Sequence, residues 1–339
     1  MLPTTSGEIV DTQTMDKTHL QLAKLEKFIG NTPVIEIFYT LDDVESSVYA
    51  KYEAWNYTGS VKDRMAINII KNAYQVGSLK EHDTIVEATS GNTGIAFAAM
   101  GAYLGHPVHI YMPDWLSEER KRILRFYGAK LFEISAKQGG FQHCVDLAAK
   151  KSAKKGFFGP KQFDNAWNVH AHMSMTAPEF AKDLKDHNID KIDVFVAGAG
   201  TGGTIMGFYR YFSPLNGDFK AVPVFPTKNT DGGHRIEGIG DSFVPKILSL
   251  SELEPVIRVS DSHAMNIARQ INKLGLSVGI SSGANVFAAI CAGEKYGNNK
   301  TIATILCDDN KKYLSTDLCS ETTENLSKEI KITDYKMLT

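Results

Sequence analysis

Short apolar segments alternate along this chain with segments of helical periodicity, and this alternation constrains the fold more than any other feature. Apolar runs bounded by turn residues predict strands at 48–55, 84–88, 108–112, 130–134, 193–199, 221–225, 256–259 and 301–306. Amphipathic or alanine-rich runs between them predict helices at 65–74, 93–104, 141–155, 204–211, 261–274 and 283–295. Strands that alternate with helices are typical of a parallel α/β architecture.

Two breaks in this pattern suggest the domain organisation. Residues 1–18 lack apolar periodicity and predict a flexible arm, whereas residues 19–29 predict a helix. Around 156–172 the alternation gives way to aromatic, Asn, Gln and His residues, and we expect the chain to cross between domains there. The polar residues at 317–339 predict a C-terminal tail.

The composition excludes several classes of protein. The chain is 43% hydrophobic and 22% charged, as expected for a globular protein, and its net charge of -2 gives no attraction to nucleic acid or anionic membranes. No apolar run approaches the roughly 18 residues of a spanning helix, and the first twenty residues lack a signal-peptide core. We expect a cytoplasmic protein. The four cysteines form no CxxC pair, so neither a metal site nor a disulfide framework is predicted.

A lysine lies at a turn between a predicted strand and a predicted helix. Residues 56–64 read Asn-Tyr-Thr-Gly-Ser-Val-Lys-Asp-Arg, so Lys62 follows a glycine-containing turn and lies just before the helix predicted at 65–74. A lysine that loses its proton near neutral pH can form a Schiff base with a carbonyl cofactor. The alternative is a solvated lysine in the first turn of a helix that Ser60 caps.

Two further turns join a strand to a helix and carry both glycines and hydroxyl groups. At 200–204 (Gly-Thr-Gly-Gly-Thr), free backbone N–H groups and the helix dipole favour a phosphate, although an unliganded turn remains an alternative. This loop has neither the Lys-Ser/Thr end of a P-loop nor the GxGxxG pattern. At 89–94 (Thr-Ser-Gly-Asn-Thr-Gly), the same arrangement suits a carboxylate, or else an ordinary helix cap.

Six motifs occur in an order that resembles pyridoxal-phosphate (PLP) enzymes of the tryptophan-synthase-β type, and most closely the cysteine synthase and cystathionine β-synthase group. They cover about residues 28–316 and lie at 30–33 (Gly-Asn-Thr-Pro), 59–64, 89–94, 200–204, 237–240 (Glu-Gly-Ile-Gly) and 279–284 (Gly-Ile-Ser-Ser-Gly-Ala). The resemblance implies PLP fold type II, in which two α/β domains with mostly parallel sheets hold the cofactor in the cleft between them. It implies a smaller mobile domain at 47–160 and a larger domain, formed by 19–46 and 161–316, that binds the PLP phosphate. It also implies a homodimer.

The resemblance assigns expected roles to individual residues. Lys62 would carry PLP and later move the α-proton, Asn92 would bind the phenolic oxygen, and Ser281 would lie beside the pyridine nitrogen. A neutral hydroxyl at that nitrogen favours loss of a β-leaving group over transamination; Ser281 alone could equally cap a helix. The expected phosphate ligands are Gly200, Thr201, Gly202, Gly203 and Thr204, and the expected substrate ligands are Thr89, Ser90, Thr93, Gln162 and Gly238.

Three segments depart from the family pattern. The family's Asn-Pro-Gly-Gly-Ser is Asn-Tyr-Thr-Gly-Ser at 56–60, and its Val-Glu-Pro is Val-Phe-Pro at 224–226, followed by a short loop that contains Asp231. Its Pro-Asp-Ser-Gly is Cys-Asp-Asp-Asn at 307–310. Asp231 is a candidate catalytic base for water or an amine nucleophile, or else a turn residue before two glycines. Cys307 either touches the cofactor ring or is a small buried residue.

The expected reaction is β-replacement on a serine-type or cysteine-type amino acid through an aminoacrylate. Addition of sulfide to O-acetylserine, as in cysteine synthase, is the default. One alternative is cysteine as the donor, with release of hydrogen sulfide and water or a thiol as acceptor; another is an amine acceptor that gives a diaminopropionate-type product. A non-enzymatic scaffold is the remaining alternative, and the intact Lys62, Asn92 and Ser281 argue against it.

Overall fold

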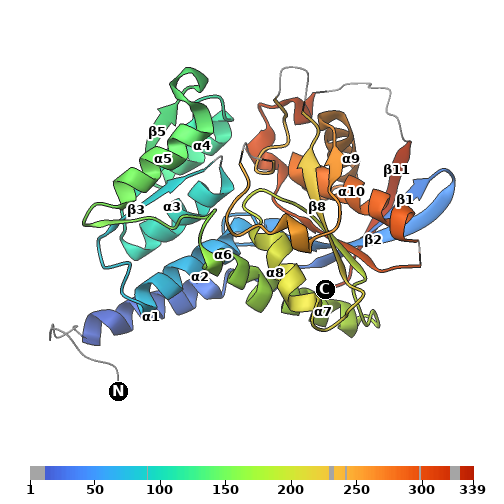
Figure 1. The fold of residues 1–339 in the computed structure, drawn as a ribbon, viewed down its shortest axis with the longest axis horizontal. Coiled ribbons are helices and arrows are strands. Elements are labelled where there is room, and N and C mark those ends of the chain that lie inside the picture. The colour runs from blue at the N-terminus through green and yellow to red at the C-terminus, as the bar shows by residue number, and fades with distance from the viewer. Residues whose placement is uncertain (1–11, 90, 229–232, 241–242, 298, 321–328) are drawn as a thin grey trace.

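The computed structural model describes residues 12–89, 91–228, 233–240, 243–297, 299–320 and 329–339, with side chains from residue 17 onward. Its strands form two separate sheets, each with helices packed on it (Figure 1). The prediction of an α/β fold with mostly parallel sheets is therefore confirmed. Within the described residues, no helix is both long and apolar enough to cross a membrane.

The larger sheet has seven strands in the order β11-β1-β2-β10-β7-β8-β9. Their bounds are β1 Val34–Leu41, β2 Val44–Tyr52, β7 Val194–Gly198, β8 Lys220–Pro226, β9 Ile257–Val259, β10 Ile302–Leu306 and β11 Ile330–Met337. The strands from β2 to β9 in this order are parallel, while β11, β1 and β2 pair antiparallel. All of β10 is buried, as expected of a central parallel strand that helices cover on both faces.

The smaller sheet has four parallel strands in the order β5-β4-β3-β6. Their bounds are β3 Thr84–Ala88, β4 Val108–Pro113, β5 Lys130–Ile134 and β6 Phe157–Phe158. Side chains of α1 Thr12–Glu26, α2 Lys62–Gln75, α3 Asn92–Leu104 and α4 Glu118–Phe126 form one core with this sheet, and α5 Gly140–Ser152 packs on its other face.

The helices of the larger domain cover both faces of the seven-stranded sheet. One face packs against α9 Asp261–Lys273 and α10 Ile280–Tyr296, and the other against α7 Ala177–Asp186 and α8 Gly203–Phe212. The short helix α6 Ala166–Ala171 packs against both α2 and α8 and so bridges the two domains. The two sheets, each with its own helices, lie side by side (Figure 1), and residues that follow β3, β7 and β10 line a cavity between them.

Three predicted boundaries are wrong. Residues 12–18 belong to α1 and not to a flexible arm. The predicted tail contains β11, which pairs along the whole of β1 because Ile330 and Ile332 bury their side chains in the core. The smaller domain does not begin at 47, because β2 lies inside the larger sheet. That strand forms a hairpin with β1 through Asp42 and Asp43, whose φ angles of 49° and 62° suit a tight hairpin turn.

Candidate active site

A cavity at the carboxyl ends of β3, β7 and β10 brings most of the predicted site residues together. Those that line it are Lys62, Thr89, Asn92, Thr93, Gln162, Gly200, Thr201, Gly202, Thr204, Gly238 and Ser281. These residues come from six separate segments of the chain and from both domains. Gly203 does not line the cavity: it faces away, where an added Cβ would lie 2.0 Å from Oδ1 of Asn168. Ser90 and Asp231 lie outside the described residues.

The turn that carries Lys62 is fixed to the end of β10. The backbone N–H of Val61 donates to the carbonyl of Cys307 at 2.9 Å, and Ser60 forms an isolated antiparallel bridge with Asp308. Lys62 then begins α2 with its side chain on the cavity. Backbone pairing on one side and a helix on the other leave this lysine little freedom of position.

A buried carboxylate holds the same turn from within. Asp63 accepts from the backbone N–H of Thr58 at 2.8 Å and from its hydroxyl at 2.6 Å. Burial raises the pKa of Asp63 to about 6, although its hydrogen bonds with Thr58 and Ser60 act in the opposite direction. The family's Pro-Gly is replaced here by Tyr-Thr, so the hydroxyl of Thr58 adds a side-chain bond that stabilises the altered turn.

The predicted phosphate loop forms the start of α8. Gly202 precedes the helix with φ +86° and has no capping side chain of its own, which leaves N–H groups of the first turn open to an anion, although the N–H of Gly203 donates to the hydroxyl oxygen of Thr201 at 3.3 Å. The hydroxyl oxygen of Thr201 accepts from Asn168 Nδ2 at 3.0 Å, so its proton is free to be donated into the cavity. Gly200 allows a close approach of two loops, because an added Cβ would lie 2.0 Å from the carbonyl oxygen of Gly238.

The predicted carboxylate-binding residues form one hydrogen-bonded group. Thr93 donates to Oε1 of Gln162 at 2.7 Å, and Nε2 of Gln162 donates to the carbonyl of Ala88 at 2.7 Å. Glu87 accepts from the backbone N–H groups of Ala88 and Gln162 and so ties both segments to β3. Burial raises the pKa of Glu87 to about 7. No sequence motif indicated Glu87, because Gln162, the residue that it ties to β3, is distant along the chain.

Asn92 has a partner that was not predicted. Its Nδ2 donates to Oδ2 of Asp308 at 2.8 Å, and the same oxygen accepts from the hydroxyl of Tyr313 at 2.8 Å. A primary amide carries two protons, so one N–H remains for a phenolic oxygen in the cavity. Asp308 is fully buried and orients Asn92. Asp308 belongs to the Cys-Asp-Asp-Asn segment that departs from the family pattern, and no sequence motif indicated a role for it.

Arg120 is a third residue that no sequence motif indicated. It comes from α4 of the smaller domain, lines the cavity, and is only 2% exposed. Its guanidinium group pairs with Glu237 of the larger domain and lies 4.6 Å from the centre of the Tyr313 ring. Its side chain also fills the space beside Gly91, whose φ of +154° excludes other residues. Arg120 therefore joins the substrate loop of one domain to two residues of the other.

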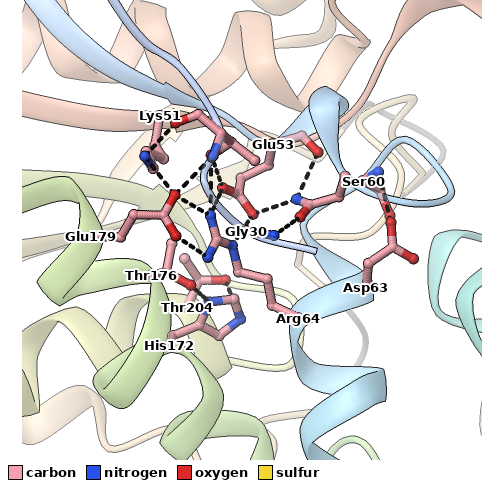
Figure 2. Close-up of polar contacts among 12 residues, drawn as sticks. Gly30, Lys51, Glu53, Ser60, Asp63, Arg64, His172, Thr176, Glu179 and Thr204 are labelled. Atoms are coloured by element: carbon pink, nitrogen blue, oxygen red, sulfur yellow. Dashed lines mark hydrogen bonds and ion pairs between the residues drawn. The ribbon is translucent and has the colours of Figure 1, made fainter. Parts of the chain in front are cut away.

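A buried ion network lies next to this cavity, two residues from Lys62 (Figure 2). Arg64 makes paired hydrogen bonds to Glu53, at 2.6 and 2.7 Å, and to Glu179, at 2.8 and 3.0 Å. Lys51 pairs with Glu179 at 2.8 Å and with Asp183 at 2.5 Å. Burial alone would raise the pKa of Glu179, but Arg64 and Lys51 lower it to about 2. The network fixes α2 to β2 and α7.

Comparison with known proteins identifies the family. The family model described as pyridoxal-phosphate dependent enzyme matches residues 25–308. Cysteine synthase B of Campylobacter jejuni is 40% identical over 302 residues, which span 87% of this chain and 98% of that protein. Cysteine synthase of Staphylococcus aureus is 35% identical over 303 residues, or 87% and 96%.

A solved structure covers still more of the chain. A hydrogen sulfide-producing enzyme from Fusobacterium nucleatum matches with a TM-score of 0.89 and 42% identity, over 94% of this chain and 99% of that one. An aspartate-to-asparagine mutant of that enzyme was solved in complex with an α-aminoacrylate intermediate, and it matches with the same TM-score at 41% identity. The chain belongs to the pyridoxal-phosphate-dependent enzymes of fold type II, is cysteine synthase-like, and catalyses β-replacement through an aminoacrylate.

Proposed function

We propose that this enzyme uses L-cysteine as the donor and water as the nucleophile, so that it releases hydrogen sulfide and forms L-serine. The observation that carries this assignment is the 42% identity, over almost the full length of both chains, to an enzyme named for hydrogen sulfide production. The step balances: the Cβ–S bond of cysteine breaks, a C–O bond to water forms, and the proton lost by water leaves with sulfide. No oxidant or reductant is required.

The residues of the cavity fit pyridoxal phosphate. The N-cap of α8 is Gly202, which has no capping side chain, the Thr201 hydroxyl proton is free, and Oδ1 of Asn92 is buried with no partner among the described residues. We assign the phosphate to Gly200–Thr204, the phenolic oxygen to Asn92 and the pyridine nitrogen to Ser281. Bound pyridoxal phosphate supplies an aldehyde for an amine and accepts the electron pair of the substrate α-carbon.

The other groups in the cavity then take the following roles. Lys62 holds the cofactor and moves the α-proton of the substrate. The substrate carboxylate is bound by Thr89, Ser90, Thr93 and Gln162. Closure of the smaller domain over the substrate excludes bulk water from the cavity. Gly238 borders the substrate, and its φ of +83° favours a residue without a Cβ.

Asp231 is the group to which we assign the activation of water. Hydrogen sulfide is largely ionised near neutral pH, so as a nucleophile it needs no base. Water, in contrast, must lose a proton as it adds to carbon. Asp231 follows the end of β8 by five residues and precedes the cavity residue Gly238 by seven. The aspartate-to-asparagine mutant of the Fusobacterium enzyme, captured with an α-aminoacrylate, supports a carboxylate in the step that follows.

Asp231→Asn is the variant that tests this proposal. It should still release sulfide from cysteine in a single turnover, but serine formation should slow by about 10²-fold or more, the usual contribution of a general base. Both products are measured after rapid mixing with cysteine, and Asp218→Asn, an exposed turn variant of the same chemistry, serves as the control. Equal slowing of both half-reactions, or of neither, would remove Asp231 from catalysis.

Cysteine synthesis from O-acetylserine and sulfide is the second candidate, favoured by the 40% identity to cysteine synthase B of Campylobacter jejuni. Assays of the wild-type enzyme distinguish the two candidate reactions. Under our proposal it releases sulfide from cysteine without an added thiol. If it instead consumes sulfide only with O-acetylserine and leaves cysteine intact, the default assignment replaces ours. A thioether or diaminopropionate-type product, detected by mass spectrometry with added thiol or amine, would identify those acceptors.

We further propose a homodimer in the cytoplasm. An aromatic patch formed by Phe28, Tyr57, Tyr103 and Tyr127 lies on the smaller domain, and Phe126, which precedes Tyr127 at the end of α4, is 92% exposed. The rings of Phe28 and Tyr57 are 6.1 Å apart, and both Tyr103 and Tyr127 lie near enough to Tyr57 to contribute to the raised pKa that burial gives it. Such aromatic side chains are enriched at protein interfaces. The cytoplasmic location remains a prediction.

Phe126→Arg should convert the dimer into a monomer, because it replaces an exposed apolar ring beside Tyr127 with a charge on the surface that a second copy would bury. Light scattering after size exclusion measures the mass. Leu215→Arg, at another exposed apolar residue (69%), should leave the dimer intact. A monomeric wild-type protein, or a Phe126→Arg variant that remains a dimer, would contradict the proposed interface.

A further inference from the structure

A histidine that no sequence motif indicated lies directly behind the phosphate loop. His172 begins a π-helical turn, His172–Thr176, between α6 and α7, and its side chain points toward Thr204 (Figure 2). Gly207 of α8 makes this approach possible: an added Cβ there would lie 2.4 Å from Cβ of His172 and 2.8 Å from the carbonyl oxygen of Val169. π-helical turns are uncommon and frequently occur at functional sites.

Both ring nitrogens of His172 have hydroxyl partners. Nδ1 lies 3.0 Å from the hydroxyl of Thr176, and Nε2 lies 3.3 Å from the hydroxyl of Thr204. The residue is 1% exposed, and burial, together with the positive charges of Lys62 and Arg64, lowers its pKa well below the ordinary value. The ring is therefore neutral and carries one proton, which must be on one nitrogen or the other.

The position of that proton determines what Thr204 offers to the cavity. A phosphate dianion presents only acceptors, and the Thr204 hydroxyl has a single proton. If Nε2 of His172 carries the ring proton, it donates to Thr204, and the Thr204 proton is free for the phosphate. If Nδ1 carries it, Nε2 can only accept, and the Thr204 proton is drawn away from the cavity.

We propose that His172 is a positioning residue for the cofactor phosphate: its Nε2–H donates to Thr204 and directs the Thr204 hydroxyl proton to the phosphate. Thr176 then donates to Nδ1. This inference rests on the assignment of Gly200–Thr204 as the phosphate site. It also gives the helix α6, which bridges the domains, a role in cofactor binding, because the π-helical turn at its end carries His172.

Two substitutions separate the ring nitrogens. In His172→Gln, the side-chain amide nitrogen takes the place of Nε2 and can still donate to Thr204. In His172→Asn, the shorter amide takes the place of Nδ1 and cannot reach Thr204. Full-length, cofactor-free protein is titrated with pyridoxal phosphate and with pyridoxal, which lacks the phosphate, and binding is followed by absorbance.

We expect His172→Asn to weaken binding of pyridoxal phosphate by about 10-fold to 100-fold, the usual effect of a hydrogen bond to a charged group, and to leave pyridoxal binding unchanged. His172→Gln should bind both within about threefold of the wild-type protein. Thr204→Val should show the same selective loss as His172→Asn, and the double variant should lose no more than either alone, because both act through one hydroxyl.

Other results would overturn the proposal. If His172→Asn weakens pyridoxal and pyridoxal phosphate equally, or if its effect adds to that of Thr204→Val, the histidine supports only the fold. If Thr204→Val itself shows no preference for losing the phosphate compound, the phosphate assignment fails instead. Nitrogen-15 spectra of the wild-type protein need no variant: a His172 proton on Nδ1 with pyridoxal phosphate bound would exclude the proposed arrangement.

Discussion

Lys62→Ala is expected to remove the visible absorbance band of the lysine-bound cofactor and to lower turnover by at least about 10²- to 10⁴-fold, the range that loss of a general base alone produces. Lys62 has two proposed roles: it holds the cofactor covalently and it moves the α-proton. Alanine can perform neither. The turn before Lys62 is fixed by backbone bonds from Val61 and Ser60 to residues 307 and 308, so the substitution should not disturb the fold.

Lys71→Ala is the matched control. Lys71 lies on the same helix, α2, with its side chain 43% exposed, and pairs with Glu26 at the surface. This variant should keep both the band and the activity. Reduction of the wild-type protein with borohydride, followed by peptide mapping, should place the label on Lys62. A label on any other lysine would defeat the site assignment as a whole.

The parts of the site that could be predicted from sequence are those that a single strand–turn–helix corner determines. Lys62, Thr89, Asn92 and Gly200 each lie where an apolar strand ends and a glycine-containing turn begins. Because parallel strands end at the same edge of a sheet, such corners converge without any knowledge of side-chain contacts. Ser281 differs, because it lies at the start of α10, which follows another helix, α9, and not a strand. Only the order of the six motifs indicated this residue.

The residues that were missed depend on contacts between segments far apart in sequence. Arg120 reaches the cavity only because α4 of one domain faces Glu237 and Tyr313 of the other. Asp308 orients Asn92 across 216 residues of chain. Neither residue type nor local periodicity encodes such a pairing. The strand β11 was missed for another reason: as an edge strand, it buries little besides Ile330 and Ile332, so its apolar content is low.

Arg64→Met is expected to lower the free energy of unfolding by about 3–5 kcal/mol, which is typical when one member of a buried ion pair is removed. Arg64 and Glu53 are both fully buried. Methionine preserves much of the volume but leaves the Glu53 carboxylate without a cationic partner. Urea unfolding of the cofactor-free protein measures the change and avoids any contribution from ligand binding.

A surface pair of similar geometry provides the control. Arg210 makes two hydrogen bonds to Glu252, at 2.6 and 2.7 Å, much as Arg64 does to Glu53. The side chains of Arg210 and Glu252 are 46% and 32% exposed, however, so water can replace the lost partner. Arg210→Met should therefore cost less than about 1 kcal/mol. Equal losses in the two variants would show that burial is not what makes the Arg64 network important.

The effect of Arg64→Met should also depend on pH. The folded protein holds the pKa of Glu179 at about 2, below its ordinary value of 4.5, so the unfolded chain binds a proton at higher pH than the folded one. The stabilisation is therefore fully present above pH 4.5 and is lost as the pH falls toward 2. Without Arg64 this depression is smaller, and the difference between wild type and variant should shrink from pH 7 to pH 3.

A variant that replaces both Glu53 and Arg64 tests whether the ion network stabilises the fold or positions the segment before the Lys62 turn. In Glu53→Met/Arg64→Met no carboxylate is left unpaired at residue 53, so the double variant should be more stable than Arg64→Met alone. Thr32 and Asn56 also bond to Glu53, so the network orients the segment before the Lys62 turn. We expect the double variant to be more stable than Arg64→Met but less active than the wild-type enzyme. A double variant as unstable as the single one, or as active as the wild-type enzyme, would contradict this positioning role.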